Sequence, residues 1–161
     1  MLTETIVEDE RWVETGLPEL AERAAKSTLR HLGLTPDHWS IGILGCDDNR
    51  MSKLNFDFLG KSRSTNVLSW PVAERSAIQP GSPPPAPKPD NRDLGDIAIA
   101  YEYCATEAIN VGRSLEDHVA HLVVHAVLHL LGYDHANDKD AALMENLERE
   151  ILVGLNVNTL Y

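Results

Sequence analysis

Apolar residues recur along the chain with two different periods, which alternate from segment to segment. Apolar positions three and four residues apart predict helices over residues 17–32, 50–59, 101–112, 115–131 and 138–152. Short runs rich in β-branched and aromatic residues predict strands over residues 3–7, 39–44, 65–70 and 94–100. Within the last helix, the residues expected to face inward are Ala142, Met144, Leu147 and Ile151. Because strands and helices alternate, we expect an α/β or α+β fold with a small mixed sheet covered by helices.

The prolines mark one long connection between two of the predicted strands. Six of the nine prolines lie between Pro80 and Pro89, a density that neither a helix nor a central strand tolerates. We expect an exposed, polyproline-like loop at about residues 79–91. The length of 161 residues fits a single domain that spans residues 1–161. Cys46 and Cys104 lack metal-binding spacing and are expected to be small core residues.

The balance of charge restricts the partners of the protein. Fourteen Lys and Arg against 25 Asp and Glu give a formal net charge of −11, which argues against a DNA-coating role. Four cations within fourteen residues form a local basic cluster, which either binds phosphate or is a solvated face: Arg50, Lys53, Lys61 and Arg63. No run of residues is long and apolar enough for a membrane helix, and the first residues lack a signal-peptide pattern. We expect a cytoplasmic protein with neither a membrane nor DNA as partner.

Histidines are concentrated in one short stretch. Five of the seven lie between residues 118 and 135, and on a helix the first four of these fall within about 80° of one another. His125 and His129 are one helical turn apart, and Gly132 permits a left-handed bend that returns His135 toward them. Three imidazoles with one open coordination position are typical of catalytic zinc. The string HAVLHLLGYDH therefore predicts a zinc site.

The same spacing matches the metzincin peptidase pattern, with one difference. Ala126 stands where that pattern has a Glu beside the first His. In those peptidases the Glu takes a proton from the zinc-bound water and passes it to the leaving amine. Ala126 therefore argues against peptide hydrolysis, whereas a less basic leaving group such as a ribose oxygen remains compatible. A degenerate peptidase stays a lesser alternative.

Several blocks of sequence together resemble one known family. These blocks are HAVLHLLGYDH, STNVLSWP at residues 64–71, LGDIAIA at residues 94–100, and Met144-Glu145-x-x-Glu148. In content, order and spacing they resemble the YbeY family of bacterial ribosomal RNA maturation factors. The resemblance extends from about residue 54 to residue 150.

The resemblance implies a fold, a metal and an activity. It implies a compact α/β fold and one Zn²⁺ per chain, held by His125, His129 and His135. It also implies a metal-dependent endoribonuclease that acts in small-subunit ribosomal RNA maturation and ribosome quality control. The implied partners are ribosomal RNA and the small ribosomal subunit or its proteins.

Further residues are expected to serve the substrate. Lys61 and Arg63 are expected to hold backbone phosphates. Asn66 and Ser69, on the strand beside the cleft, are expected to face the substrate, and His121 is a further lining candidate.

Three more positions leave alternatives open. Asp134 is a candidate proton acceptor, although a turn-stabilising role fits it as well. Asp96 in the LGDI block is expected to make structural hydrogen bonds. Leu59 stands where the family usually has an arginine that could clamp a phosphate. This departure leaves open a zinc-stabilised ribosome-assembly binding factor with little or no catalysis.

Overall fold

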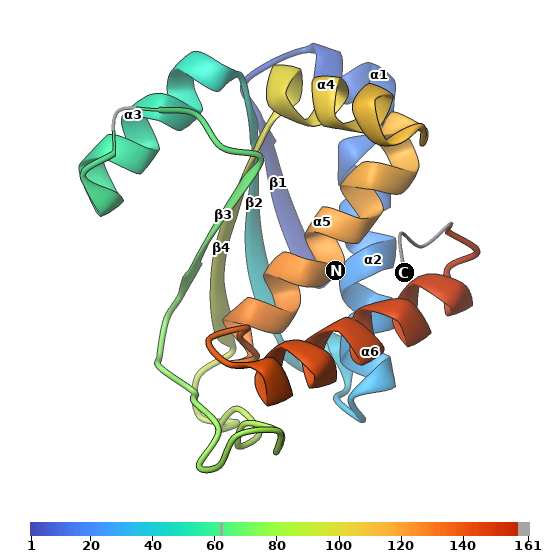
Figure 1. Cartoon of the computed structure of the whole chain (residues 1–161). Helices are drawn as coiled ribbons and strands as arrows, with labels where there is room; N and C mark the ends of the chain where they lie inside the picture. The colour runs from blue at the N-terminus through green and yellow to red at the C-terminus, as the bar shows by residue number, and fades with distance from the viewer. Residues whose placement is uncertain (62, 158–161) are drawn as a thin grey trace.

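A mixed four-stranded sheet forms the centre of the computed structural model, which describes residues 1–61 and 63–157 (Figure 1). The strands are β1 (Thr3–Val7), β2 (Ser40–Cys46), β3 (Val67–Pro71) and β4 (Asp93–Ala100). They lie in the order β1-β2-β4-β3. The first three strands in this order are parallel, whereas β3 runs antiparallel to β4. β3 is therefore an edge strand with a partner on one side.

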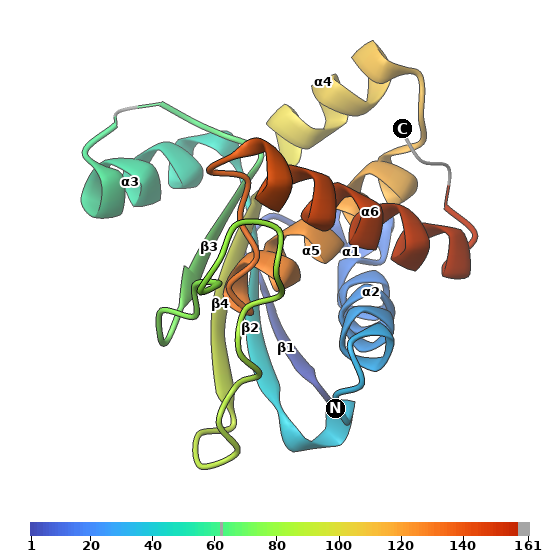
Figure 2. The ribbon, with the colours of Figure 1, turned by 60° about the horizontal axis from the view of Figure 1, so that its bottom comes forward.

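Helices lie on both faces of the sheet. They are α1 (Arg11–Thr15), α2 (Leu17–His31), α3 (Asp48–Leu59), α4 (Tyr101–Val111), α5 (Leu115–Leu130) and α6 (Asp138–Gly154), with a short 3₁₀ helix at Pro36–His38. α2 and α5 cover one face, α6 packs across them, and α3 lies on the opposite face (Figures 1 and 2). The five helices and four strands predicted from the sequence are confirmed, each within two residues of its predicted ends. The expected α+β fold with a small mixed sheet is likewise confirmed.

α5 is the central helix of its layer. It packs against β3 and β4 of the sheet and against α2, α4 and α6. Eleven of its 16 residues are buried, as expected for a helix that is largely apolar all round. Within the described residues, none of the helices has both the length and the apolar character that crossing a bilayer requires. Because neighbours surround α5, its backbone is a rigid support for the histidines that it carries.

The proline-rich segment belongs to the connection between β3 and β4, residues 72–92. It is less exposed than expected, since Pro87 is buried and lines a small hollow together with Tyr133. The amide of Gly81 donates a hydrogen bond to Oδ1 of Asp140, 2.8 Å away. The loop therefore lies against the bend between α5 and α6.

Two expectations about side chains are wrong. Ala142 of α6 is exposed, and the buried face of that helix carries Glu148 beside Met144 instead. Asp96 on β4 is exposed, and its carboxylate makes no hydrogen bond to any residue in the described part of the chain. It stands over Gly42 of β2, where an added Cβ would overlap its carboxylate. This is the face of the sheet that carries α3, away from the histidines.

The buried carboxylate of Glu22 ties β1 to α2. Its Oε2 accepts a hydrogen bond from the amide of Leu2 (3.1 Å), and its Oε1 accepts from the amide and the hydroxyl of Thr3 (both 2.7 Å). Nζ of Lys26 lies 3.2 Å from Oε2. Burial alone would raise the pKa of Glu22, but these donors outweigh it and lower the pKa to about 2.

The substitution Glu22→Gln is expected to lower the free energy of unfolding by about 2–3 kcal/mol at neutral pH, because the amide leaves buried donors unpaired. The carboxylate of Glu22 stabilises the fold above about pH 4.5, and this contribution is lost as the pH falls toward about 2. Urea unfolding of the metal-free wild type and of Glu22→Gln should therefore show a difference in free energy of unfolding that becomes smaller as the pH falls. Glu14→Gln, at an exposed position of α1, is the control. Equal stability of all three proteins at neutral pH would contradict this role of Glu22.

Candidate metal centre

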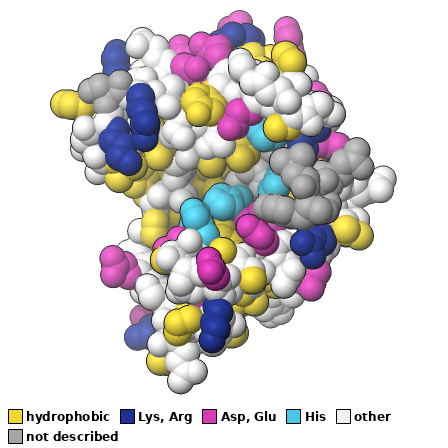
Figure 3. Space-filling view, viewed as in Figure 1, with side chains coloured by type: hydrophobic (Ala, Val, Ile, Leu, Met, Phe, Trp, Pro, Cys, Tyr) yellow, Lys and Arg dark blue, Asp and Glu magenta, His cyan; other side chains and the backbone are white. Residues whose placement is uncertain are grey.

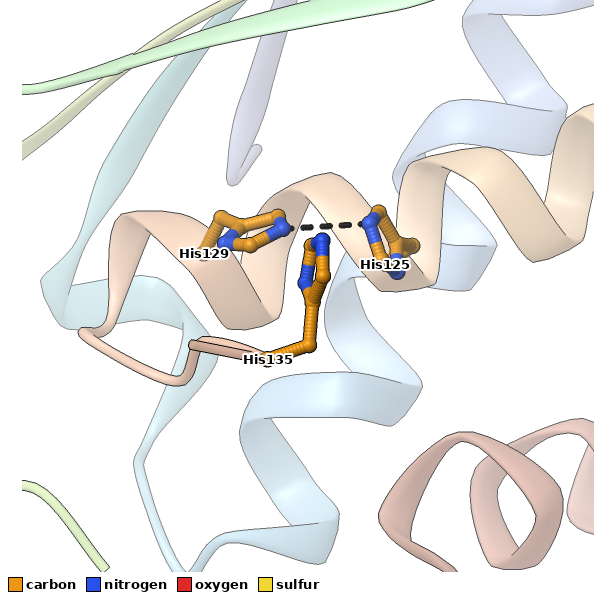
Figure 4. Close-up of side chains that lie close together, drawn as sticks. All are labelled: His125, His129 and His135. Atoms are coloured by element: carbon orange, nitrogen blue, oxygen red, sulfur yellow. Dashed lines mark hydrogen bonds between the residues drawn. The ribbon is translucent and has the colours of Figure 1, made fainter. Parts of the chain in front are cut away.

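Three histidine side chains converge beside α5 (Figure 4). His125 and His129 lie one turn apart on the helix, and His135 lies on the bend that follows it. Nε2 of His125 is 3.1 Å from Nε2 of His129, and one nitrogen from each of the three rings lies within 4.8 Å of the others. Two nitrogens bound to one tetrahedral zinc would be roughly 3.3–3.4 Å apart. The group could therefore hold a metal ion.

The bend that returns His135 depends on Gly132. Its φ of +102° lies in the region that side chains disfavour, and an added Cβ would overlap the backbone carbonyl of Arg75. The amide of Tyr133 donates to the carbonyl of Leu128 (3.0 Å), which closes the end of the helix. The sequence prediction that glycine turns the chain here is confirmed.

A buried carboxylate on α6 holds the first of these histidines. Oε2 of Glu148 lies 2.6 Å from Nδ1 of His125, and Oε1 lies 2.9 Å from Nε2 of His121. The other ring nitrogen of His121, Nδ1, lies 3.0 Å from Nη1 of Arg113. Glu148 is 1% exposed, so these contacts form in the interior.

The order of donors and acceptors along these hydrogen bonds fixes the tautomers of His121 and His125. Because a guanidinium only donates, Nδ1 of His121 must accept, and its Nε2 carries the proton that is donated to Glu148. The second carboxylate oxygen accepts from Nδ1–H of His125 in the same way. The free lone pair of His125 is therefore on Nε2, the nitrogen that faces His129. Carboxylates that orient a histidine in this manner are common around protein metal sites.

His129 is prepared for metal binding by its surroundings. Burial and the neighbouring rings of His125 and His135 lower the pKa of His129 to about 4, despite the opposing effect of Asp134. Its imidazole is therefore neutral at neutral pH and offers a lone pair. A metal competes with protons for such ligands, so a neutral ring favours binding.

Two adjoining hollows open at the histidines. The first, of about 420 Å³, lies between β3 and α5 and is lined by residues 66–69, His121, Leu122, His125, Ala126, His129 and Glu148. The second, of about 290 Å³, is lined by Ser69, Pro71, residues 74–76, His129 and residues 132–134. Figure 3 shows histidine side chains in a depression of this face, with Lys and Arg gathered over α3. Ser69 and His129 line both hollows, so the two hollows adjoin each other at these residues. We refer to the two hollows together as the groove.

A second, half-buried network positions the edge of this groove. Nδ2 of Asn66 donates to Oε1 of Glu107 on α4 (3.1 Å), and Nε2 of His118 lies 3.0 Å from the same oxygen. Oδ1 of Asn66 accepts from the amide of Val67 (2.7 Å). Both functional groups of the Asn66 side chain are thus engaged in fixing the start of β3.

Most of the predicted site residues lie together in the structure. Those that line the groove are His121, Asn66, Ser69 and Asp134, in addition to His125 and His129. Asp134 is exposed and accepts a hydrogen bond from the amide of His135 (2.7 Å), as a turn-stabilising residue would. Lys61 and Arg63 follow α3, are exposed, and line neither hollow.

Sequence reasoning gave no role to three residues that organise the site: it did not single out Arg113 and Glu107, and it used Glu148 only as part of the Met144-Glu145-x-x-Glu148 block. Only Glu148 carries a local signal. It lies one turn after Met144, so it is an acidic residue on the buried side of an amphipathic helix. Its partners on α5 are more than twenty residues away and become visible only when α6 packs on α5.

Position 126 carries no carboxylate to act as the glutamate of metzincin peptidases does. Ala126 is buried, and both carboxylate oxygens of Glu148 are engaged by histidines. The metzincin route therefore lacks its glutamate at the usual position.

Glu148→Gln is expected to weaken zinc binding by about 10- to 100-fold, because one amide group cannot accept hydrogen bonds from both His121 and His125. Competition with a chromophoric chelator measures this affinity directly. Glu145→Gln, at an exposed position of the same helix, is the matched control and should bind zinc as the wild type does. Unchanged affinity in a folded Glu148→Gln protein would show that the carboxylate does not prepare the ligand.

Comparison with known proteins identifies the family. The family model described as "Endoribonuclease YbeY" matches residues 5–156. A protein of Ruegeria pomeroyi with this name is 49% identical over 164 residues, covering 100% of this chain and 98% of the relative. Its namesake from Bartonella quintana is 42% identical over 156 residues, covering 96% and 93%.

A solved structure supports the fold independently. The solution structure of a Thermotoga maritima protein superposes with a TM-score of 0.57 at 17% identity, covering 96% of this chain and 92% of that one. The order of the sequence blocks, the converging histidines and the match over nearly the whole chain agree with one another. The chain therefore belongs to the YbeY endoribonuclease family.

Proposed function

We propose that this protein is a zinc-dependent endoribonuclease of the cytoplasm that acts in small-subunit ribosomal RNA maturation and ribosome quality control. The observation that carries the proposal is the convergence of His125, His129 and His135 at a groove open to solvent. The curated relatives are named endoribonucleases, which supports RNA as the substrate. The ribosomal role follows from the family resemblance.

The donor set fits zinc. Three histidine nitrogens leave one coordination position open, as in catalytic rather than structural zinc sites. A zinc ion held there would supply Lewis-acid chemistry, polarising a phosphoryl oxygen or lowering the pKa of a water. The chain itself contributes neutral rings, a fixed tautomer at His125 and the walls of the groove.

The surrounding residues divide the remaining tasks. Ser69 is proposed to contact the RNA along β3, and Asn66, whose side chain is tied to Glu107 and Val67, is proposed to face the RNA with the hydrogen-bonding capacity that those two contacts leave. Glu148 is tied to two histidines, so Asp134, which is 62% exposed in its side chain, is the better placed proton acceptor. Lys61 and Arg63 lie outside the hollows and are proposed to meet phosphates farther along the RNA. His121 acts through Glu148 as a positioning residue.

The proposed partners are ribosomal RNA and the small ribosomal subunit or its proteins. With a net charge of −11, the molecule as a whole repels RNA, so binding must rely on local cations and on the metal. Lys and Arg side chains cluster over α3, and they are visible from the same side of the molecule as the histidines, although α3 covers the other face of the sheet (Figure 3). This arrangement favours a specific encounter over indiscriminate coating.

The test compares cleavage of a structured RNA by the zinc-loaded wild type and by His129→Ala at equal folded fraction. We expect the variant to lose about two orders of magnitude or more in rate, because one of three ligands is gone. A chelator should abolish wild-type cleavage, and added zinc should restore it. His31→Ala, where the ring meets Glu150 away from the groove, is the control.

Other outcomes would favour the alternatives. Equal rates for the wild type and His129→Ala would remove the metal from the chemistry. RNA binding without cleavage would support the binding factor, which the absence of an arginine at Leu59 favours. Chelator-sensitive turnover of unstructured peptides would support the degenerate peptidase.

A further inference from the structure

A nuclease must hold its substrate on both sides of the phosphate that it cleaves. The groove has two hollows that adjoin at His129. His121, His125 and Glu148 line the first hollow and not the second. The second hollow is therefore available for a neighbouring part of the RNA backbone. Binding a phosphate there requires a positive charge in the hollow.

Arg75 is the only Lys or Arg among the described residues that line either hollow. Arg50 lines a different hollow, on the face of the sheet that carries α3. The second hollow also contains Glu74 and Asp134. Without Arg75 its charged side chains would be two carboxylates, which would repel a phosphate.

Two contacts anchor Arg75 beside the metal centre. Its Nη1 donates a hydrogen bond to the carbonyl of Leu130, the last residue of α5, at 2.8 Å. Its backbone carbonyl packs against Gly132, which has no Cβ to obstruct it. The guanidinium is thus placed at the negative end of the helix that carries His125 and His129.

The rest of the guanidinium is available to a ligand. Nε and Nη2 of Arg75 make no hydrogen bond or ion pair within the described part of the chain, and the side chain is half-buried. A guanidinium that is held at one nitrogen presents its remaining N–H groups in a fixed plane. That geometry suits the oxygens of a phosphodiester.

We propose that Arg75 binds a backbone phosphate of single-stranded RNA in the second hollow, next to the metal centre. The inference rests on the proposed function, since it takes RNA as the substrate. Arg75, in the connection after β3, would then make the phosphate contact that Leu59 cannot make. Lys61 and Arg63 then have secondary roles in binding.

The experiment measures the affinity of the zinc-loaded protein for a short fluorescent single-stranded RNA at several salt concentrations. We expect Arg75→Gln to weaken binding about tenfold at low salt and to reduce the slope of log affinity against log salt by about 1. Gln retains an N–H donor for Leu130, and Arg75→Lys should restore the slope. Arg23→Gln, at an exposed position of α2 outside both hollows, is the matched control and should change the affinity by less than about twofold.

A second variant keeps the proposal testable if Arg75→Gln does not fold. Glu74→Gln removes a carboxylate from the same hollow at an exposed position, so it should strengthen RNA binding several-fold. Unchanged affinity and slope in a folded Arg75→Gln protein, or unchanged affinity in Glu74→Gln, would overturn the role of Arg75. If one of these results is obtained while the wild type still cleaves RNA, only this inference fails. If the wild type neither binds nor cleaves RNA, the proposed function fails with it.

Discussion

The buried carboxylate of Glu148 determines which nitrogen of His125 faces the centre of the three histidines. Without an acceptor at Nδ1, either nitrogen of the ring could carry the proton, and the ring could turn. The carboxylate is in turn held by His121, which contacts Arg113, so a charge on α6 is linked to a guanidinium in the connection between α4 and α5. An ionised carboxylate in the interior is costly unless it is fully hydrogen-bonded, and this chain supplies the partners.

The elements around the site have separate tasks. α5 supplies two histidines from a rigid, buried backbone, and the bend at Gly132 supplies the third from an exposed position. β3 forms one wall, and Asn66 at its start is fixed to Glu107 on α4. The connection after β3 forms the continuation of the groove, because Arg75 packs against both Leu130 and Gly132. Rigid parts thus hold the ligands, while the surrounding loops can differ in the charges that they present to a substrate.

Local pattern predicts the helices and strands well, because their hydrophobic periodicities and capping residues lie within each segment. Asp47 and Ser114, for example, cap α3 and α5 with their own side chains. The histidine group is predictable for the same reason, since i, i+4 spacing and a glycine bend are properties of one short string. The order of the strands follows from contacts between distant segments, and the sequence pattern does not specify it.

The parts of the site that escape prediction are those built by tertiary packing. Glu148 reaches His125 only because α6 crosses α5, and Ala142 is exposed because the same crossing turns it outward. The basic cluster near α3 suggested Lys61 and Arg63 as residues of the groove, whereas the fold of residues 72–92 places Arg75 there. Charge clustering in sequence says nothing about which cation lies beside a site formed by a distant helix.

The most direct measurement for the central claim is a crystal structure of the zinc-loaded protein with anomalous diffraction recorded on both sides of the zinc absorption edge. The account predicts one strong zinc peak about 2.0–2.1 Å from a nitrogen of each of His125, His129 and His135. His125 should bind through Nε2, with its Nδ1 still hydrogen-bonded to Glu148. A peak elsewhere, or zinc bound directly to Glu148 or to Nδ1 of His125, would contradict the account.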